Sequence, residues 1–227
     1  MLDSKVIIAL DYSDEKEVWQ FCERLDNNKC KLKVGKQLFT KYGPSLVEKL
    51  QSKGFKIFLD LKFHDIPTTV YKASIEAYKL GIWMLNVHAL GGAEMMRAAL
   101  QARDEINSES KLIGVTVLTS HSDESLSRIG IGKRDNLAKI LANQVSDVGL
   151  DGVVCSPSDI ESIGIREESF LFVTPGIRLS LDSDDHNNAF TPKQACSLGA
   201  DYIVIGRPIT ESDDPMCILD KVVSSTY

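Results

Sequence analysis

The stretch FLDLKFHDIPTT, residues 58–69, sets the interpretation of the whole chain, because an apolar run changes abruptly into a charged segment. The run KIFLDLK (56–62) is continuous enough for a β-strand that is buried on both faces. A stretch with helical spacing, SIEAYKLG (74–81), follows it and ends on a glycine. A buried strand followed by a helix is the repeating unit of a parallel α/β fold.

Similar apolar runs recur along the chain at fairly regular intervals. They are KVIIALD (5–11), KLKVG (31–35), WMLNVH (83–88), KLIGVTVLT (111–119), GVVCS (152–156), FLFVTPG (170–176) and DYIVIGR (201–207). Further helical patterns between them are VEKLQSKG (47–54), EMMRAALQAR (94–103) and NLAKILANQVSDVG (136–149). This alternation predicts an α/β fold, a single (β/α)8 TIM barrel that forms one catalytic domain over residues 1–227. An open doubly wound sheet is the alternative, but no glycine fingerprint of a dinucleotide site follows the first strand.

Length and composition limit the class of protein. With 227 residues the chain can bury the core of one domain, although length alone also allows two small ones. A formal net charge of −6 argues against a nucleic-acid partner. The five cysteines include no CxxC pair, which indicates reduced intracellular thiols rather than disulfides or a zinc site. We expect a cytoplasmic protein without a membrane partner, because no run reaches the roughly 18 apolar residues of a span and no signal peptide is evident.

Polar groups gather where the predicted strands end. In a (β/α)8 barrel the active site lies at the carboxyl ends of the strands and in the loops that follow. The groups expected there are Asp11, Lys33, Asp60, Lys62, His88, Thr119, Ser156, Pro175, Gly176, Gly206 and Arg207. Because most of them can ionise or form hydrogen bonds, they indicate one shared site at the mouth of the barrel.

Charges of both signs are concentrated on one strand end. Asp60 and Lys62 are two residues apart on a strand, so their side chains share a face, and Lys33 can lie beside them. A solvent-exposed chain of ion pairs is the ordinary alternative, but unneutralised charge is costly at the end of an apolar strand. A lysine held between Asp60 and Asp65 should stay protonated. Such an ammonium can stabilise a carbanion and then protonate it.

The last two strand ends have the features of a phosphate site. PGIR (175–178) and IGRP (205–208) supply glycines whose backbone N–H groups can approach an anion, and Arg207 can bind two phosphate oxygens. Local positive potential of this kind allows a protein of net charge −6 to hold a nucleotide. The polar stretch LSLDSDDHNNAFT (179–191) is long enough for a lid or a disordered segment.

Four segments together resemble the orotidine 5'-monophosphate decarboxylase family. They are KVG (33–35), DLKFHDIPTT (60–69), VTPGIR (173–178) and DYIVIGRPIT (201–210). The likeness runs along nearly the whole chain and is closest to the bacterial, stand-alone form. It implies removal of CO2 from orotidylate to give uridylate, the last step of de novo UMP biosynthesis, with no metal, pyridoxal phosphate or other cofactor.

The resemblance also implies roles for individual residues. Lys62 would stabilise and protonate the C6 carbanion, held by Asp60 and Asp65, while Lys33 would complete the network and touch the ribose. In the family, Asp65, Ile66 and Thr69 reach into the site of the second subunit, which implies a homodimer. The other substrate-binding residues are then Asp11 and Thr119 near the ribose, Ser156 at the pyrimidine, and Pro175, Arg178, Gly206 and Arg207 near the phosphate. The family closes a loop over the phosphate with the glutamine of a DQ pair; the pair here is Asp185–His186, and we expect His186 to donate to the phosphate instead.

Two other functions are compatible with parts of this pattern. A sugar-phosphate lyase or decarboxylase on the same barrel typically needs magnesium and carries an acidic residue where Lys33 stands. A non-catalytic phosphate-binding barrel would have little need for the arrangement of Asp60, Lys62 and Asp65. His64 and His88 lack the spacing of a metal-binding helix, so we expect backbone hydrogen bonds for them and no metal site.

Overall fold

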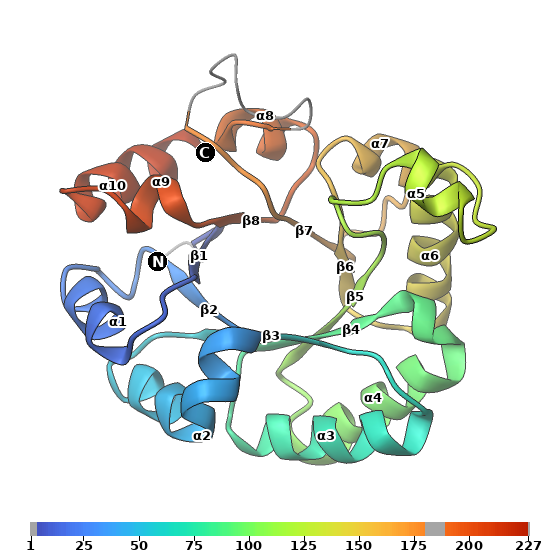
Figure 1. Ribbon diagram of the computed structural model, residues 1–227, viewed down its shortest axis with the longest axis horizontal. Helices are drawn as coiled ribbons and strands as arrows, with labels where there is room; N and C mark the ends of the chain where they lie inside the picture. The colour runs from blue at the N-terminus through green and yellow to red at the C-terminus, as the bar shows by residue number, and fades with distance from the viewer. Residues whose placement is uncertain (1–3, 180–188, 227) are drawn as a thin grey trace.

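A computed structural model describes residues 4–179 and 189–226 of the chain, and its centre is a closed ring of parallel strands (Figure 1). The strands are β1 (Val6–Leu10), β2 (Lys31–Gly35), β3 (Ile57–Phe63), β4 (Met84–His88), β5 (Lys111–Val115), β6 (Gly152–Val154), β7 (Leu171–Thr174) and β8 (Tyr202–Ile205). Each strand pairs with the next in sequence, and β8 pairs with β1 to close the barrel. The predicted (β/α)8 barrel is therefore confirmed.

Helices surround the ring in Figure 1. They are α1 (Glu15–Cys22), α2 (Lys36–Ser52), α3 (Pro67–Lys79), a 3-10 turn η1 (Ala89–Gly91), α4 (Gly92–Ile106), α5 (Asp123–Ser127), α6 (Arg134–Val148), α7 (Asp159–Ile163), α8 (Pro192–Ser197), α9 (Arg207–Thr210) and α10 (Pro215–Ser225). The four helical stretches expected from the sequence fall on α2, α3, α4 and α6. Helix α2 begins much earlier than expected and bends at Gly43 (φ 60°, ψ −154°), immediately before Pro44. A proline cannot continue the hydrogen bonding of a regular helix, so the pattern on the N-terminal side of this bend is harder to recognise.

All eight strands lie within or next to the apolar runs that predicted them, because a strand covered on both faces needs apolar residues at nearly every position. All five residues of β1 are buried, for example. The largest difference is in β5, which ends at Val115. Thr119, expected at a strand end, therefore belongs to the following loop.

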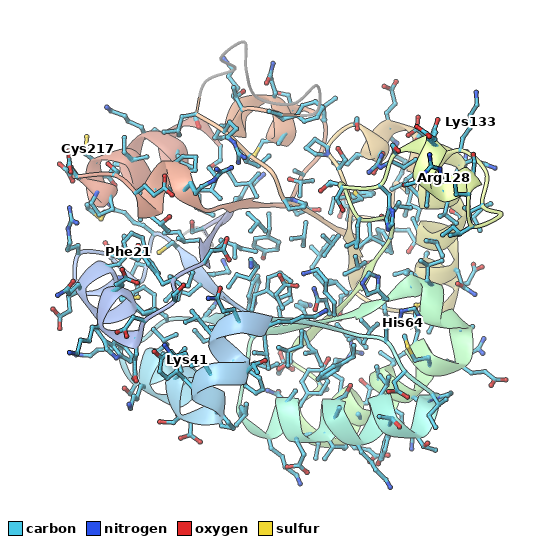
Figure 2. All side chains as sticks on the ribbon, in the orientation of Figure 1. Phe21, Lys41, His64, Arg128, Lys133 and Cys217 are labelled. Atoms are coloured by element: carbon cyan, nitrogen blue, oxygen red, sulfur yellow. The ribbon has the colours of Figure 1, made fainter. Side chains whose placement is uncertain are left out.

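The barrel has two apolar cores. The larger one lies between the strands and the helices and includes Val6, Ile8 and Leu10 of β1. The smaller one fills the ring itself and consists of Ile7, Ala9, Phe58, Met84, Ile113, Val173 and Val204. Figure 2 shows side chains occupying this space inside the strands. The barrel is thus a packed solid up to the mouth, where the chemistry of the site begins.

Two expectations from composition can be compared with the structure. All five cysteines are unpaired, and Cys22, Cys30 and Cys155 among them are buried. Within residues 4–179 and 189–226, no helix has the length and apolar character needed to cross a bilayer.

Candidate active site

A cavity opens at the carboxyl ends of the strands, and its two sides differ in character. It is lined by Lys33, Phe58, Asp60, Lys62, Asn86, Val115, Val117, Leu118, Thr119, Val154, Cys155, Pro175 and Val204. The charged and amide groups come from β2, β3 and β4, whereas residues from β5 to β8 are mainly apolar. Phe58 and Val204 also belong to the core inside the barrel, so the floor of the cavity is apolar.

A chain of ion pairs crosses the polar side of the cavity. Asp60 lies between two lysines: Lys62 Nζ is 2.5 Å from Oδ1 of Asp60, and Lys33 Nζ is 3.2 Å from Oδ2. Lys33 also lies 3.7 Å from Oδ1 of Asp11. The side chain of Asp60 is 9% exposed and that of Asp11 is 68% exposed, so the chain runs from solvent to the interior. The predicted meeting of Lys33, Asp60 and Lys62 is found in the structure.

Asp60 is held as an anion. Burial raises the pKa of its carboxyl group, but the charges of Lys33 and Lys62 and the hydrogen bonds from Lys62 and Asn86 together outweigh burial and lower the pKa below its usual value. The carboxylate is therefore ionised at neutral pH.

The backbone leaves regular strand geometry at Lys62. Its φ of 50° makes it the one non-glycine residue with positive φ in the described part of the chain. The pairing of β3 with β4 is also irregular there, since the register shifts between Leu59 and Phe63. Asn86 of β4 contacts both sides of this irregularity: its Oδ1 accepts from the Lys62 N–H at 2.8 Å, and its Nδ2 donates to Oδ1 of Asp60 at 2.6 Å.

The segment that follows β3 is largely exposed and does not line the cavity. Asp65, Ile66 and Thr69 are exposed, and Ile66 is the N-cap of α3. Asp65 accepts a hydrogen bond from the backbone N–H of Ile66 at 2.7 Å. Asp65 does not line the cavity and makes no ion pair with Lys62 in the part of the chain that is described. The predicted contact between Asp65 and Lys62 is thus not made within one subunit.

Ser156, expected at the pyrimidine, is fixed by a buried ion pair. Its backbone N–H donates to Oδ2 of Asp159 at 3.1 Å, and its hydroxyl lies 2.9 Å from that of Ser158. Asp159 is held by two hydrogen bonds from Arg134, at 2.8 and 2.9 Å. Ser156 adjoins Cys155, which lines the cavity, and Thr119 lines it directly from the loop that follows the neighbouring strand β5.

The residues expected near a phosphate lie at the ends of β7 and β8. Pro175 lines the cavity, and Gly176 has a φ of 80°, a conformation that favours glycine. The Arg178 N–H donates to the carbonyl of Phe190 at 2.9 Å. A Cβ added to Gly206 would lie 3.5 Å from Oδ2 of Asp11, so this strand end adjoins the ion-pair chain. Arg207 begins α9 and is exposed. His186 lies outside the described residues.

The two histidines of this region lie against each other. The rings of His64 and His88 are 5.5 Å apart between centroids, and Figure 2 shows His64 on the connection between β3 and α3. Nδ1 of His88 is buried without a hydrogen-bond partner among the described residues, so the expectation of a backbone bond is wrong for this atom. Burial, followed by the charges of His64, Lys62 and Lys36, lowers the pKa of His88 to about 4, against an opposing effect of Asp60.

Comparison with known proteins gives a consistent result. The family model described as orotidine 5'-phosphate decarboxylase / HUMPS family matches residues 4–222. The chain belongs to this family. The orotidine 5'-phosphate decarboxylase of Nitrosococcus oceani is 49% identical over 228 residues, which cover 98% of this chain and 97% of that protein. That of Pseudoalteromonas translucida is 47% identical over 97% of this chain and 96% of its own length.

Solved structures agree with the orotidine 5'-phosphate decarboxylase family assignment. The crystal structure of orotidine 5'-phosphate decarboxylase from Lactobacillus acidophilus superimposes with a TM-score of 0.87 at 37% identity, covering 99% of both chains. The resemblance inferred from the four sequence segments is therefore confirmed.

Three residues next to the predicted site were not identified from the sequence. Asn86 interrupts the apolar run WMLNVH, and this single polar residue was the available signal. Arg134 and Asp159 are far apart in sequence and lie in ordinary helical segments, so no pattern indicated that they meet beneath Ser156.

Proposed function

We propose that the protein decarboxylates orotidine 5'-monophosphate to uridine 5'-monophosphate and CO2, the last step of UMP biosynthesis, without a cofactor. The observation that carries this proposal is the buried Asp60 carboxylate joined to two lysines beside an apolar cavity floor. The family membership and the named relatives support the same reaction.

The reaction needs a cation at one carbon atom. When the bond between C6 and the carboxylate breaks, the electron pair stays on C6 in an orbital outside the ring π system, where resonance cannot spread it. The Lys62 ammonium stabilises this pair and then transfers a proton to C6, so the products are uridylate and CO2. Asp60 holds the ammonium in place before the reaction begins, which is the form of electrostatic preorganisation that is effective in a site shielded from water.

Asp60 also raises the free energy of the bound substrate relative to the transition state. A substrate carboxylate placed beside Asp60 brings two negative charges together, and the repulsion disappears as neutral CO2 leaves. Lys33 limits this repulsion by pairing with the other oxygen of Asp60, and its ammonium, which lies between Asp60 and Asp11, also contacts a ribose hydroxyl together with Asp11.

The phosphate of the substrate binds outside the cavity. The cavity volume is about 230 Å³, below the roughly 300–1,000 Å³ of sites that enclose a whole small ligand. The pyrimidine occupies the cavity between Lys62 and Ser156, and the ribose lies near Asp11 and Thr119. The phosphate then lies at the ends of β7 and β8, with Gly206 and Arg207 as the main ligands and Pro175, Arg178 and His186 around it.

The active form is a homodimer. Asp65 is exposed and makes no ion pair with Lys62 of its own chain, and its neighbour Ile66 is 63% exposed, which is unusual for a large apolar residue. Leu90 on η1 is 47% exposed. A second subunit that covers this surface would bury the apolar side chains and bring Asp65, Ile66 and Thr69 to the neighbouring site. Each chain then forms one catalytic domain over residues 1–227, and a cytoplasmic location fits a reaction on a soluble nucleotide.

A spectrophotometric assay tests the proposal, because the absorbance of orotidylate changes on decarboxylation. We expect turnover by the purified protein in the presence of EDTA and loss of turnover in a Lys62→Ala variant. Absence of activity in the wild-type protein, or activity that vanishes with EDTA and returns only with magnesium, would refute it. The second result would favour a magnesium-dependent sugar-phosphate lyase.

A further inference from the structure

The strand that carries Asp60 and Lys62, β3, pairs with its neighbour β4 in an irregular register. Leu59 pairs with Leu85, and the next aligned pair is Phe63 with Val87. Asp60, Leu61 and Lys62 of β3 therefore lie opposite Asn86 of β4 alone. A backbone ladder cannot satisfy the polar groups of such a segment in the regular way, and a buried polar group without a partner is costly.

The side chain of Asn86 supplies hydrogen bonds where regular pairing of the two strands is interrupted. It is 1% exposed, and its carbonyl oxygen accepts from the Lys62 N–H at 2.8 Å. Its amide nitrogen donates to Oδ1 of Asp60 at 2.6 Å. Because an N–H only donates and an ionised carboxylate only accepts, one orientation of the amide satisfies both partners and the flipped orientation satisfies neither.

These contacts form a closed ring of hydrogen bonds that includes the reactive ammonium of Lys62. Oδ1 of Asp60 accepts from both Asn86 Nδ2 and Lys62 Nζ, the latter at 2.5 Å. Asn86 therefore holds Lys62 at its backbone directly and at its ammonium through Asp60. The left-handed backbone at Lys62 is a conformation that persists only where the surroundings impose it, and Asn86 is the group in contact with its N–H.

We propose that Asn86 is a positioning residue for the decarboxylation, fixing the Lys62 backbone and the Asp60 carboxylate so that the ammonium faces the reacting carbon. This role rests on the proposed function. Asn86 acts through Lys62 and Asp60, although it also lines the cavity.

The chemistry of the site requires an asparagine here. Aspartate has the same shape and keeps an acceptor for the Lys62 N–H, but it loses the donor to Asp60 and places a second negative charge beside it. Alanine loses both bonds. The two substitutions therefore separate the effect on the carboxylate from the effect on the backbone.

The test compares Asn86→Asp and Asn86→Ala with the wild-type protein and with Ser110→Ala. Ser110 is an equally buried polar residue at the other end of the barrel, where its hydroxyl donates to the carbonyl of Ile82 at 2.6 Å. We expect kcat to fall about 100-fold in both Asn86 variants, as for a misplacement of about 1 Å at a reacting group, with a much smaller change in KM. We expect Ser110→Ala to keep kcat even if its unfolding temperature falls.

The pH profile gives a readout that a merely structural role would not change. Loss of the amide donor raises the pKa of Asp60, which must be ionised to hold Lys62. The acidic limb of the kcat/KM profile should therefore move to higher pH in Asn86→Asp and stay unchanged in Ser110→Ala.

A second measurement keeps this proposal separate from the proposed function. The Asp60 carboxyl can be titrated by 13C NMR, which needs no turnover, and its midpoint should rise in Asn86→Asp. If the wild-type protein were inactive on orotidylate but this shift occurred, the function would be wrong and the positioning of Asp60 by Asn86 would stand. The positioning role is overturned if Asn86→Asp keeps kcat within about twofold and an unshifted Asp60 titration, or if neither Asn86 variant folds, since the residue would then be structural.

Discussion

Lys62 and Asp60 are joined at 2.5 Å across a part of β3 where the backbone has left regular strand geometry. In a regular strand, the side chains of residues two apart project from the same face. They run roughly parallel and are separated by about one repeat of the pleat, so they do not meet. The positive φ at Lys62 turns its side chain back onto the carboxylate. The contact that the chemistry needs therefore depends on a backbone conformation that an L-residue rarely adopts.

The first prediction concerns this backbone conformation. Lys62→Gly and Lys62→Ala both remove the ammonium, so both should be inactive. Glycine adopts positive φ without steric cost, so Lys62→Gly should be more stable than Lys62→Ala by about 1 kcal/mol in urea unfolding. At Lys33, in the regular part of β2, the same pair of substitutions should give the opposite order. An alanine variant at position 62 as stable as the glycine variant would show that the backbone is not strained.

The second prediction concerns acid stability and follows from His88. The folded protein has a pKa of about 4 for His88, whereas an unfolded histidine takes up its proton near pH 6.5. Between these pH values the unfolded state binds more protons, so stability should be complete above about pH 6.5 and fall as the pH is lowered toward about 4. His88→Gln should reduce the difference in urea midpoint between pH 7 and pH 5. His121→Gln, on the loop before α5, controls for loss of one histidine and should keep it.

The third prediction tests the shared site. Lys62→Ala and Asp65→Ala dimers should each be inactive. A hybrid dimer contains one site with both residues intact, so mixing equal amounts should restore roughly a quarter of wild-type activity once subunits exchange at random. Exchange can be followed with subunits of different mass. Complete exchange without recovered activity would exclude a site that Asp65 enters from the partner.

The fourth prediction concerns Arg207 and the phosphate. Arg207→Ala should lower kcat/KM for orotidylate by about 10- to 100-fold, the effect of one or two lost charge-assisted hydrogen bonds. Decarboxylation of orotidine, which lacks the phosphate, should be unchanged by the same substitution. Arg128→Ala serves as the control for loss of a surface guanidinium, since the Arg128 side chain is 77% exposed. An equal loss of kcat/KM with orotidylate and with orotidine would show that Arg207 does not act through the phosphate.

The fifth prediction concerns the buried pair beneath Ser156. Asp159 is 1% and Arg134 is 12% exposed at the side chain, so Asp159→Asn would leave a largely buried guanidinium with only its longer, 3.6 Å pair to the exposed Asp135 and cost about 3 kcal/mol of stability. KM for orotidylate should also rise, because an amide has one acceptor oxygen where the carboxylate has two, so the Ser156 N–H must compete with Arg134 for it. Glu124→Gln breaks the exposed pair with Arg128 and should change neither quantity. If KM stays constant in Asp159→Asn, the pair supports the fold but not the position of Ser156.

The barrel and the centre of its charge network could be predicted from the sequence because both depend on local patterns. A strand buried on both faces must be apolar at nearly every position, and such runs are visible without knowledge of their neighbours. Asp60 and Lys62 lie two apart on one run, and Lys33 lies on the adjacent one, so the strand order alone brings them together.

Other features could not be predicted because they depend on contacts between distant segments. The shift in register that places three residues of β3 opposite Asn86 has no counterpart in composition or spacing. The same holds for Asp159, whose role emerges only when Arg134 reaches it from another helix. Asp65 illustrates the opposite case: it belongs to a recognisable motif, yet within one chain it makes no ion pair with Lys62.

The uneven burial of the ion-pair chain has a consequence for the response to dissolved salt. Asp11 is 68% exposed, so counterions can screen its attraction for Lys33, whereas the Asp60 carboxylate is 9% exposed and its 2.5 Å contact with Lys62 is screened much less. Raising the ionic strength should therefore loosen the outer end of the chain, where the sugar is expected, and leave the inner pair intact. Ionic strength would then change the affinity for the substrate without changing the rate at which the bond to CO2 breaks.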